Sequence, residues 1–176
     1  MPRSSWRSIP EKGEPMDPLS KLISREAAAE EVAPRKERPG SVADHWTPAV
    51  LLERAAYLRK MAAQGNGSAS EVLKEYPQHC SMLSFRSRNG QAEVHERFAD
   101  FFIILAGGTT LITGGTVVGA KTIAPGETRG DSIEGGTRQE LKVGDVAHVP
   151  AGTPHQMLVS SEKTMTCLLI KVQEAV

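Results

Sequence analysis

The chain has 176 residues, with 21 Lys or Arg against 21 Asp or Glu, so its formal net charge is zero. This length fits one domain of ordinary size, and the balanced charge argues against a nucleic-acid-binding protein or one that binds an anionic membrane surface. The longest apolar stretch is too short to cross a bilayer, and the N-terminus lacks the apolar segment of a secretory signal. We therefore expect a cytoplasmic protein whose partner is a small molecule, with no nucleic acid and no membrane.

Prolines and glycines divide the chain into two parts. Six of the 11 prolines fall within the first 40 residues, whereas 12 of the 16 glycines lie at or after Gly90. Residues 1–45 contain few apolar side chains and are predicted to form a flexible or partly helical N-terminal arm, with one short helix over 25–32. This arm is either disordered or draped over a partner subunit.

Residues 46–76 are predicted to be a helical segment that packs on the domain. Thr47 followed by Pro48 is typical of a helix start, and apolar residues then recur at helical spacing as far as Gly65. Ser68 and Glu71 have the spacing of a capping box, which predicts a second, short helix that ends before Pro77.

Residues 77–176 show the alternating pattern of β-strands. Asn89-Gly90 is a strong hairpin signal, and glycine pairs separate several of the later apolar runs. An all-β sandwich or barrel is the predicted fold class. The expected strands cover 80–86, 91–97, 100–105, 109–113, 116–123, 138–141, 146–149, 155–160 and 165–172.

Two stretches of this β region have the residue types of a metal site. In residues 144–155 a Gly-Asp turn starts a strand, and a tight Pro-x-Gly turn then holds the backbone of His155, as a metal ligand requires. In the other stretch, Glu93 and His95 are two residues apart and so share one face of a strand, while Asp100 begins the next strand.

These stretches resemble the two motifs of the cupin superfamily. The second motif, G-x5-P-x-G-x2-H-x3-N, fits Gly144 to His155 at every spacing, with Val159 in place of the Asn. In the first motif, G-x5-H-x-H-x4-E-x6-G, His95 and Gly107 match, while Glu93 replaces the first His, Asp100 replaces the Glu and Ser87 replaces the opening Gly. The resemblance covers about residues 81–172 and is nearest to small single-domain bacterial cupins.

The resemblance implies a cupin double-stranded β-helix, or jelly-roll, barrel that is often dimeric and holds one divalent metal ion at its mouth. His95 and His155 are the implied metal ligands. Asp100 is one methylene shorter than the usual Glu, so it either binds the metal directly, bridges through water or only hydrogen-bonds the preceding turn. Glu93 is either a further ligand or a salt-bridge partner on the pocket wall. Two imidazoles with carboxylates suit Fe(II) or Mn(II), and Zn(II) or Ni(II) also fit.

Other polar residues have weaker signals. Residues 126–136 are predicted to be a polar loop near the barrel mouth, where Arg129 or Arg138 holds a carboxylate-bearing ligand. His148 is expected to make a cross-strand polar contact, and Glu96 to face solvent. Surface or packing roles are expected for His45 and His79, and buried, reduced thiols for Cys80 and Cys167.

The functional prediction is a metal-binding cupin, either a metalloenzyme or a binding protein. The enzyme would be a mononuclear oxygenase, isomerase or decarboxylase acting on a small oxygen-rich molecule. The alternative is a non-catalytic small-molecule-binding or sensor protein with a weakened metal site. A third hypothesis is a mainly structural homodimer whose arm serves a partner protein, since a fold alone does not choose among these.

Overall fold

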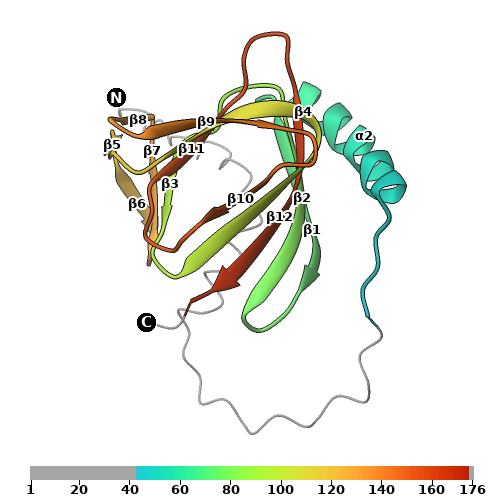
Figure 1. Ribbon diagram of the computed structural model, residues 1–176, viewed down its shortest axis with the longest axis horizontal. Coiled ribbons are helices and arrows are strands. Elements are labelled where there is room, and N and C mark those ends of the chain that lie inside the picture. Colours follow the sequence, from blue (N-terminus) through green and yellow to red (C-terminus); the bar gives the residue numbers. More distant parts are fainter. Residues whose placement is uncertain (1–42, 175–176) are drawn as a thin grey trace, which may run out of the picture.

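One helix is followed by twelve strands in the part of the chain that the computed structural model describes, residues 43–174 (Figure 1). The predicted helix over 25–32 and nearly all of the predicted arm lie outside these residues. The elements are α2 (Pro48–Gln64), β1 (Ser68–Glu75), β2 (His79–Arg86), β3 (Ala92–His95), β4 (Phe98–Thr113), β5 (Thr116–Val118), β6 (Lys121–Ala124), β7 (Glu127–Gly130), β8 (Ser132–Glu134), β9 (Thr137–Lys142), β10 (Val146–Val149), β11 (His155–Leu158) and β12 (Met165–Gln173).

The strands form a barrel of two antiparallel sheets that share β4. One sheet has the order β1-β2-β12-β4-β10, and the other has the order β9-β4-β11-β3-β7-β6. The first half of β4 pairs with β12 and β10, and its second half with β9 and β11. The short pair β5-β8 lies on the side of the barrel away from α2 (Figure 1). The predicted all-β fold is confirmed, and its two-sheet barrel is the jelly roll that the cupin resemblance implies.

Gly107 allows β4 to pass from one sheet to the other. Its φ of +71° lies in the left-handed region, and a Cβ there would come within 1.8 Å of the carbonyl oxygen of Thr164. The neighbouring Gly108 N–H donates to the same oxygen at 3.2 Å. The closing glycine of the first motif therefore marks the bend of the longest strand.

The interior between the two sheets is mainly apolar. The larger cluster of buried side chains comprises Phe102, Ile104, Leu111, Val149, Met157, Val159, Met165 and Cys167. Val159, which stands where the second motif has Asn, is thus a core residue. Cys80 and Cys167 are buried and free, as predicted.

The predicted helix forms and covers the outer face of β1 and β2. The Thr47 hydroxyl accepts a hydrogen bond from the Val50 N–H at 3.3 Å, and Pro48 occupies the first turn. The buried face of α2, residues Leu51, Ala55, Leu58 and Ala62, packs against Leu83 and Phe85 of β2. Helix α2, the one helix in residues 43–174, is not long and apolar enough to cross a membrane.

The second predicted helix was wrong, because residues 68–75 form strand β1. This segment pairs with β2 from the Ser68–Arg86 pair to the Glu75–Cys80 pair. Its alternate residues contact two different apolar clusters, Ala69 and Leu73 under α2 and Val72 beside Cys80 and Met82. Pairing with a neighbouring strand outweighs a local capping signal, because β structure is decided by tertiary context.

The predicted hairpin at Asn89-Gly90 was also wrong, since β2 and β3 belong to different sheets. The turn instead connects the two sheets. Hydrogen bonds to β11 and to the residue after it hold the turn in place. The Asn89 side-chain oxygen accepts from the Val159 N–H at 2.9 Å, and the Gly90 N–H donates to the Met157 carbonyl at 2.8 Å. Tertiary hydrogen bonds thus set the turn's place.

Residues 126–136 are not a loop but contain β7 and β8, and the predicted strand over 116–123 is divided into β5 and β6. β7 was not predicted because two of its four residues, Glu127 and Arg129, are charged. Both are nevertheless buried, because their side chains form ion pairs inside the barrel.

Gly107→Ala is expected to lower the free energy of unfolding by about 3 kcal/mol or more, because the added Cβ collides with backbone as well as straining φ. Gly144→Ala is the matched control. Gly144 has a φ of +90° but nothing lies within 4 Å of its added Cβ, so a loss of about 1 kcal/mol is expected. Urea unfolding of both variants measures the difference, and equal losses would contradict the role of the bend.

Candidate metal centre

Four potential ligand atoms from the two motifs meet inside the barrel. His95 Nε2 lies 3.3 Å from Glu93 Oε2 and 3.5 Å from Asp100 Oδ2. His155 Nε2 lies 3.4 Å from the same Asp100 oxygen and 3.9 Å from the same Glu93 oxygen. Glu93, His95 and His155 each offer an atom within 4.8 Å of the other two, which is the arrangement of a three-ligand metal site. The structure thus brings together all four residues that the sequence singled out.

Strand register produces this meeting. Glu93 of β3 and His155 of β11 are directly opposed across the two strands. The tight turn of the second motif is tied to the first, because the Gly152 N–H donates to the His95 carbonyl at 2.7 Å. Asp100 comes from β4, the strand that belongs to both sheets.

Both imidazoles direct their Nε2 atoms to the centre. The Nδ1 of His155 lies 3.0 Å from the Thr153 carbonyl oxygen, and the Nδ1 of His95 lies 2.6 Å from Glu127 Oε2. Carbonyl and carboxylate oxygens only accept, so each Nδ1 carries the proton and leaves the lone pair of the neutral ring on Nε2. Among residues 43–174, both Nε2 atoms are buried and have no aligned hydrogen-bond partner.

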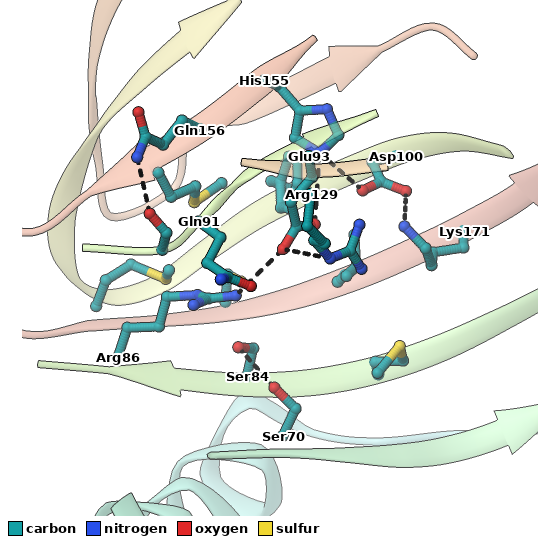
Figure 2. A pocket seen from close by; sticks show the side chains of 17 residues that line it. Ser70, Ser84, Arg86, Gln91, Glu93, Asp100, Arg129, His155, Gln156 and Lys171 are labelled. Atoms are coloured by element: carbon teal, nitrogen blue, oxygen red, sulfur yellow. Dashed lines mark hydrogen bonds and ion pairs between the residues drawn. The ribbon is translucent and has the colours of Figure 1, made fainter. Parts of the chain in front are cut away.

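Cations neutralise the carboxylates of the site. The Lys171 ammonium, whose side chain is 1% exposed, forms an ion pair with Asp100 Oδ1. Arg129 Nη1 lies 3.2 Å from Glu127 Oε2. Figure 2 shows the two cations beside Glu93 Oε1, with Arg129 Nε at 3.9 Å and Arg86 Nη2 at 4.0 Å. Burying an unpaired charge is costly, so these pairs are a condition for the site to exist.

The pKa values follow from these neighbours. Burial favours the protonated acid, but Lys171 and the two imidazoles hold the pKa of the Asp100 carboxyl well below its usual range. Burial opposes ionisation of Glu93 too, but His95 and Arg129 keep the pKa of that carboxyl well below its usual range. Burial and Lys171 disfavour a charged His95, yet the three surrounding carboxylates raise its pKa to about 10. Both acids are therefore ionised at neutral pH.

The sequence patterns did not predict that three residues, Glu127, Lys171 and Arg86, belong to the site. Glu127 falls in the segment predicted as a loop. Lys171 had a usable signal, because it is a single charge between Ile170 and Val172 in an apolar strand. Arg86 had none, because it ends a predicted strand where a solvent-facing arginine is common.

The remaining polar predictions have mixed outcomes. Arg129 is buried in the site, whereas Arg138 is exposed on β9. His148 is exposed and stacks on Phe101 with ring centroids 4.2 Å apart, so the predicted polar contact was wrong. His79 stacks on Tyr76, as a packing role requires, and Glu96 faces solvent as predicted.

A cavity of about 60 Å³ opens beside the ligand atoms (Figure 2). Glu93, Asp100 and His155 line it on the metal-centre side. Its other walls combine apolar side chains with the cations Arg86, Arg129 and Lys171. The cavity thus places room for a few atoms of a small molecule beside three of the four candidate ligands.

No protein-family model and no curated protein sequence matches the chain. The solved structures to which it is similar include a Cupin 2 conserved barrel domain protein from Salinispora arenicola, with 14% identity, 61% of this chain and 77% of that chain covered and a TM-score of 0.43. The Cnp3 cupin domain of Schizosaccharomyces pombe has 13% identity, 61% of each chain covered and a TM-score of 0.45. The polyketide cyclase RemF from Streptomyces resistomycificus has 13% identity, 62% and 68% covered and a TM-score of 0.44. At these identities the likeness concerns the fold and gives no information on the chemistry of the site.

The metal-free protein is expected to lose stability as the pH rises through the basic range. The pKa of His95 is raised from 6.5 to about 10, so the charged ring stabilises the fold fully below pH 6.5 and this contribution is lost as the pH approaches about 10. Urea unfolding of chelator-treated protein at several pH values from about 6 to 9.5 measures this slope. His95→Gln should flatten it, while His148→Gln, outside the barrel, should not. An unchanged slope in His95→Gln would contradict the charged ring.

Proposed function

We propose that the chain binds one divalent metal ion through His95, His155 and Glu93, with Asp100 as a fourth ligand. The observation that carries this proposal is the pair of buried Nε2 atoms that face the same two carboxylates and have no aligned hydrogen-bond partner among residues 43–174. A proton on His95 would satisfy only that ring and would leave His155 Nε2 buried without a donor. A single cation shared by the four atoms satisfies both rings and both acids.

The ligand set favours Fe(II) or Mn(II). Two imidazoles with one carboxylate and open positions are typical of mononuclear non-haem iron sites, and a second carboxylate makes the set harder. Zn(II) and Ni(II) also fit imidazole and carboxylate ligands and would compete for the site. The imidazoles are held from behind by Glu127 and Thr153, the kind of outer contact that fixes the orientation of a metal-binding histidine.

The proposed activity is that of a mononuclear metalloenzyme acting on a small oxygen-rich molecule, of the oxygenase, isomerase or decarboxylase type. A bound metal would supply Lewis-acid or dioxygen chemistry. The protein's own residues would bind the substrate in the cavity, exclude water from it and keep Asp100 ionised through Lys171.

The second candidate function is a non-catalytic small-molecule-binding or sensor protein. One observation favours it: Asp100 Oδ1 is already paired with Lys171, which leaves a single oxygen of this shorter acid for a metal. Such a site would bind the metal more weakly than a site with a free carboxylate.

Metal binding is tested first. We expect one Fe(II), Mn(II) or Zn(II) per wild-type chain, and a loss of affinity of about 100-fold or more in His95→Ala and in His155→Ala, because each removes one of few ligands. His148→Ala is the matched control, since its imidazole is exposed on the outside of the barrel and should bind no metal. Elemental analysis after reconstitution and calorimetric titration measure both quantities. Wild-type protein that stays free of stoichiometric metal would contradict the proposal.

The enzyme and the binding protein differ in oxygen consumption. Iron-loaded protein is mixed with catechols, β-diketones and thiols under anaerobic conditions, and oxygen uptake is then followed. Uptake above that of His155→Ala treated with iron in the same way supports an oxygenase. No uptake over the whole panel favours Lewis-acid chemistry or simple binding.

A further inference from the structure

The cavity beside the metal centre contains an arginine whose hydrogen-bonding capacity is unused. The Arg86 side chain is 24% exposed and lines the cavity. Its nearest charged neighbour is Glu93, at 4.0 Å, and its guanidinium forms no hydrogen bond with any residue between 43 and 174. Figure 2 shows this side chain extending along the cavity toward Glu93. A guanidinium has five N–H donors, so most of this capacity is left for an occupant of the cavity.

The other two cations of the cavity have partners inside the site. Lys171 is paired with Asp100. Arg129 donates to Glu127 at 3.2 Å and lies 3.9 Å from Glu93. Of these three cations, Arg86 is therefore the one placed to bind a ligand without giving up a closer contact.

The place of Arg86 is prepared by the backbone next to it. A Cβ at Gly90 would lie 3.1 Å from Arg86 Nη1. Because glycine has no side chain, the guanidinium has room to lie against the backbone at Gly90. The Gly90 backbone is itself held, because its carbonyl accepts from Gln156 Nε2 at 2.9 Å and its N–H donates to the Met157 carbonyl at 2.8 Å. This fixed surface limits where the guanidinium can lie and so prepares it for a ligand.

The charge of the metal-loaded site calls for an anion. A histidine that binds a metal must be neutral, so His95 and His155 carry no charge in the metal-loaded site. Among the residues described, the three carboxylates and three cations around the centre then balance: Glu93, Asp100, Glu127, Arg86, Arg129 and Lys171. A divalent ion would add two positive charges to this buried cluster. An occupant with negative charge would compensate them, whereas a neutral occupant would leave them unbalanced.

The rest of the cavity is suited to a short carbon chain. Its apolar walls are formed by Met82, Phe102, Met157, Met165 and Leu169. The Glu93 carboxylate lies between the Arg86 guanidinium and the two imidazoles, with Oε1 facing Arg86 and Oε2 facing the imidazoles. A molecule that contacts both the Arg86 guanidinium and the metal needs an anionic end and a second oxygen a few bonds away.

We propose that Arg86 binds the carboxylate of a small amphiphilic carboxylic acid whose second oxygen reaches the metal. This inference rests on the proposed function, because it assigns the substrate class of the same centre. Planar carboxylates match the guanidinium fork with two parallel hydrogen bonds, which selects them over neutral groups of equal shape. In this proposal the carboxylate-binding residue is Arg86, and not Arg129 or Arg138 as expected from the sequence.

The test uses Zn²⁺-loaded protein and two matched probes, 3-hydroxybutanoate and 3-hydroxybutanamide, which both carry the second oxygen, have the same number of heavy atoms and differ in charge. We expect 3-hydroxybutanoate to bind and to shift the Arg86 Nε–H signal in NMR spectra, and 3-hydroxybutanamide to bind at least roughly 10-fold more weakly. Arg86→Gln should lose this preference. Arg138→Gln, which removes an exposed arginine on β9, is the control and should keep it.

Separate titrations distinguish the two possible failures. If the wild-type chain binds no Zn²⁺, the proposed metal site is wrong. If Zn²⁺ binds and Arg86→Gln still prefers 3-hydroxybutanoate, the carboxylate contacts another group and the role of Arg86 is wrong. Should Arg86→Gln fail to fold, as judged by circular dichroism, the wild-type NMR titration decides: equal shifts of Arg86 with both probes overturn the proposal.

Discussion

The structure depends on the neutralisation of buried carboxylates. Asp100 and Glu127 are buried in the barrel interior, where an isolated charge costs several kcal/mol, and Glu93 is half-buried beside them. Each of the three lies beside a cation and an imidazole. The site is thus a network in which acids, imidazoles and cations keep one another in place. Its two Nε2 atoms are the part of this network that residues 43–174 leave without an aligned hydrogen-bond partner.

Strand pairing builds the network with few residues. β3 lies between β11 and β7, so Glu93 faces His155 on one side and Arg129 on the other, while His95 faces Glu127. On the other sheet, Asp100 of β4 faces Lys171 of β12. Four contacts of the site are therefore between directly opposed residues. Antiparallel strands bring such pairs within about 5 Å, which explains why the charges meet without long loops.

Sequence patterns predicted the local features of the site and missed the long-range ones. The position of His155 depends on a turn only a few residues before it, and the shared face of Glu93 and His95 depends on strand periodicity; both are local and were predicted. The pairing of Asp100 with Lys171, 71 residues away, depends on which strands become neighbours. β7 was missed for a related reason, since its charges are buried only because the site neutralises them. β1 was missed because its partner strand, and not its own residues, decides its conformation.

The opposed pair of Asp100 and Lys171 also constrains how the protein can change over evolutionary time. Loss of either residue alone leaves a charge buried without its partner, at a cost of about 3–5 kcal/mol, which is a large part of the stability of a small domain. Loss of both to apolar residues of similar volume avoids that cost. Positions 100 and 171 should therefore covary among related chains, either both charged or both apolar. A lineage that abandons the metal centre would be expected to replace the two together.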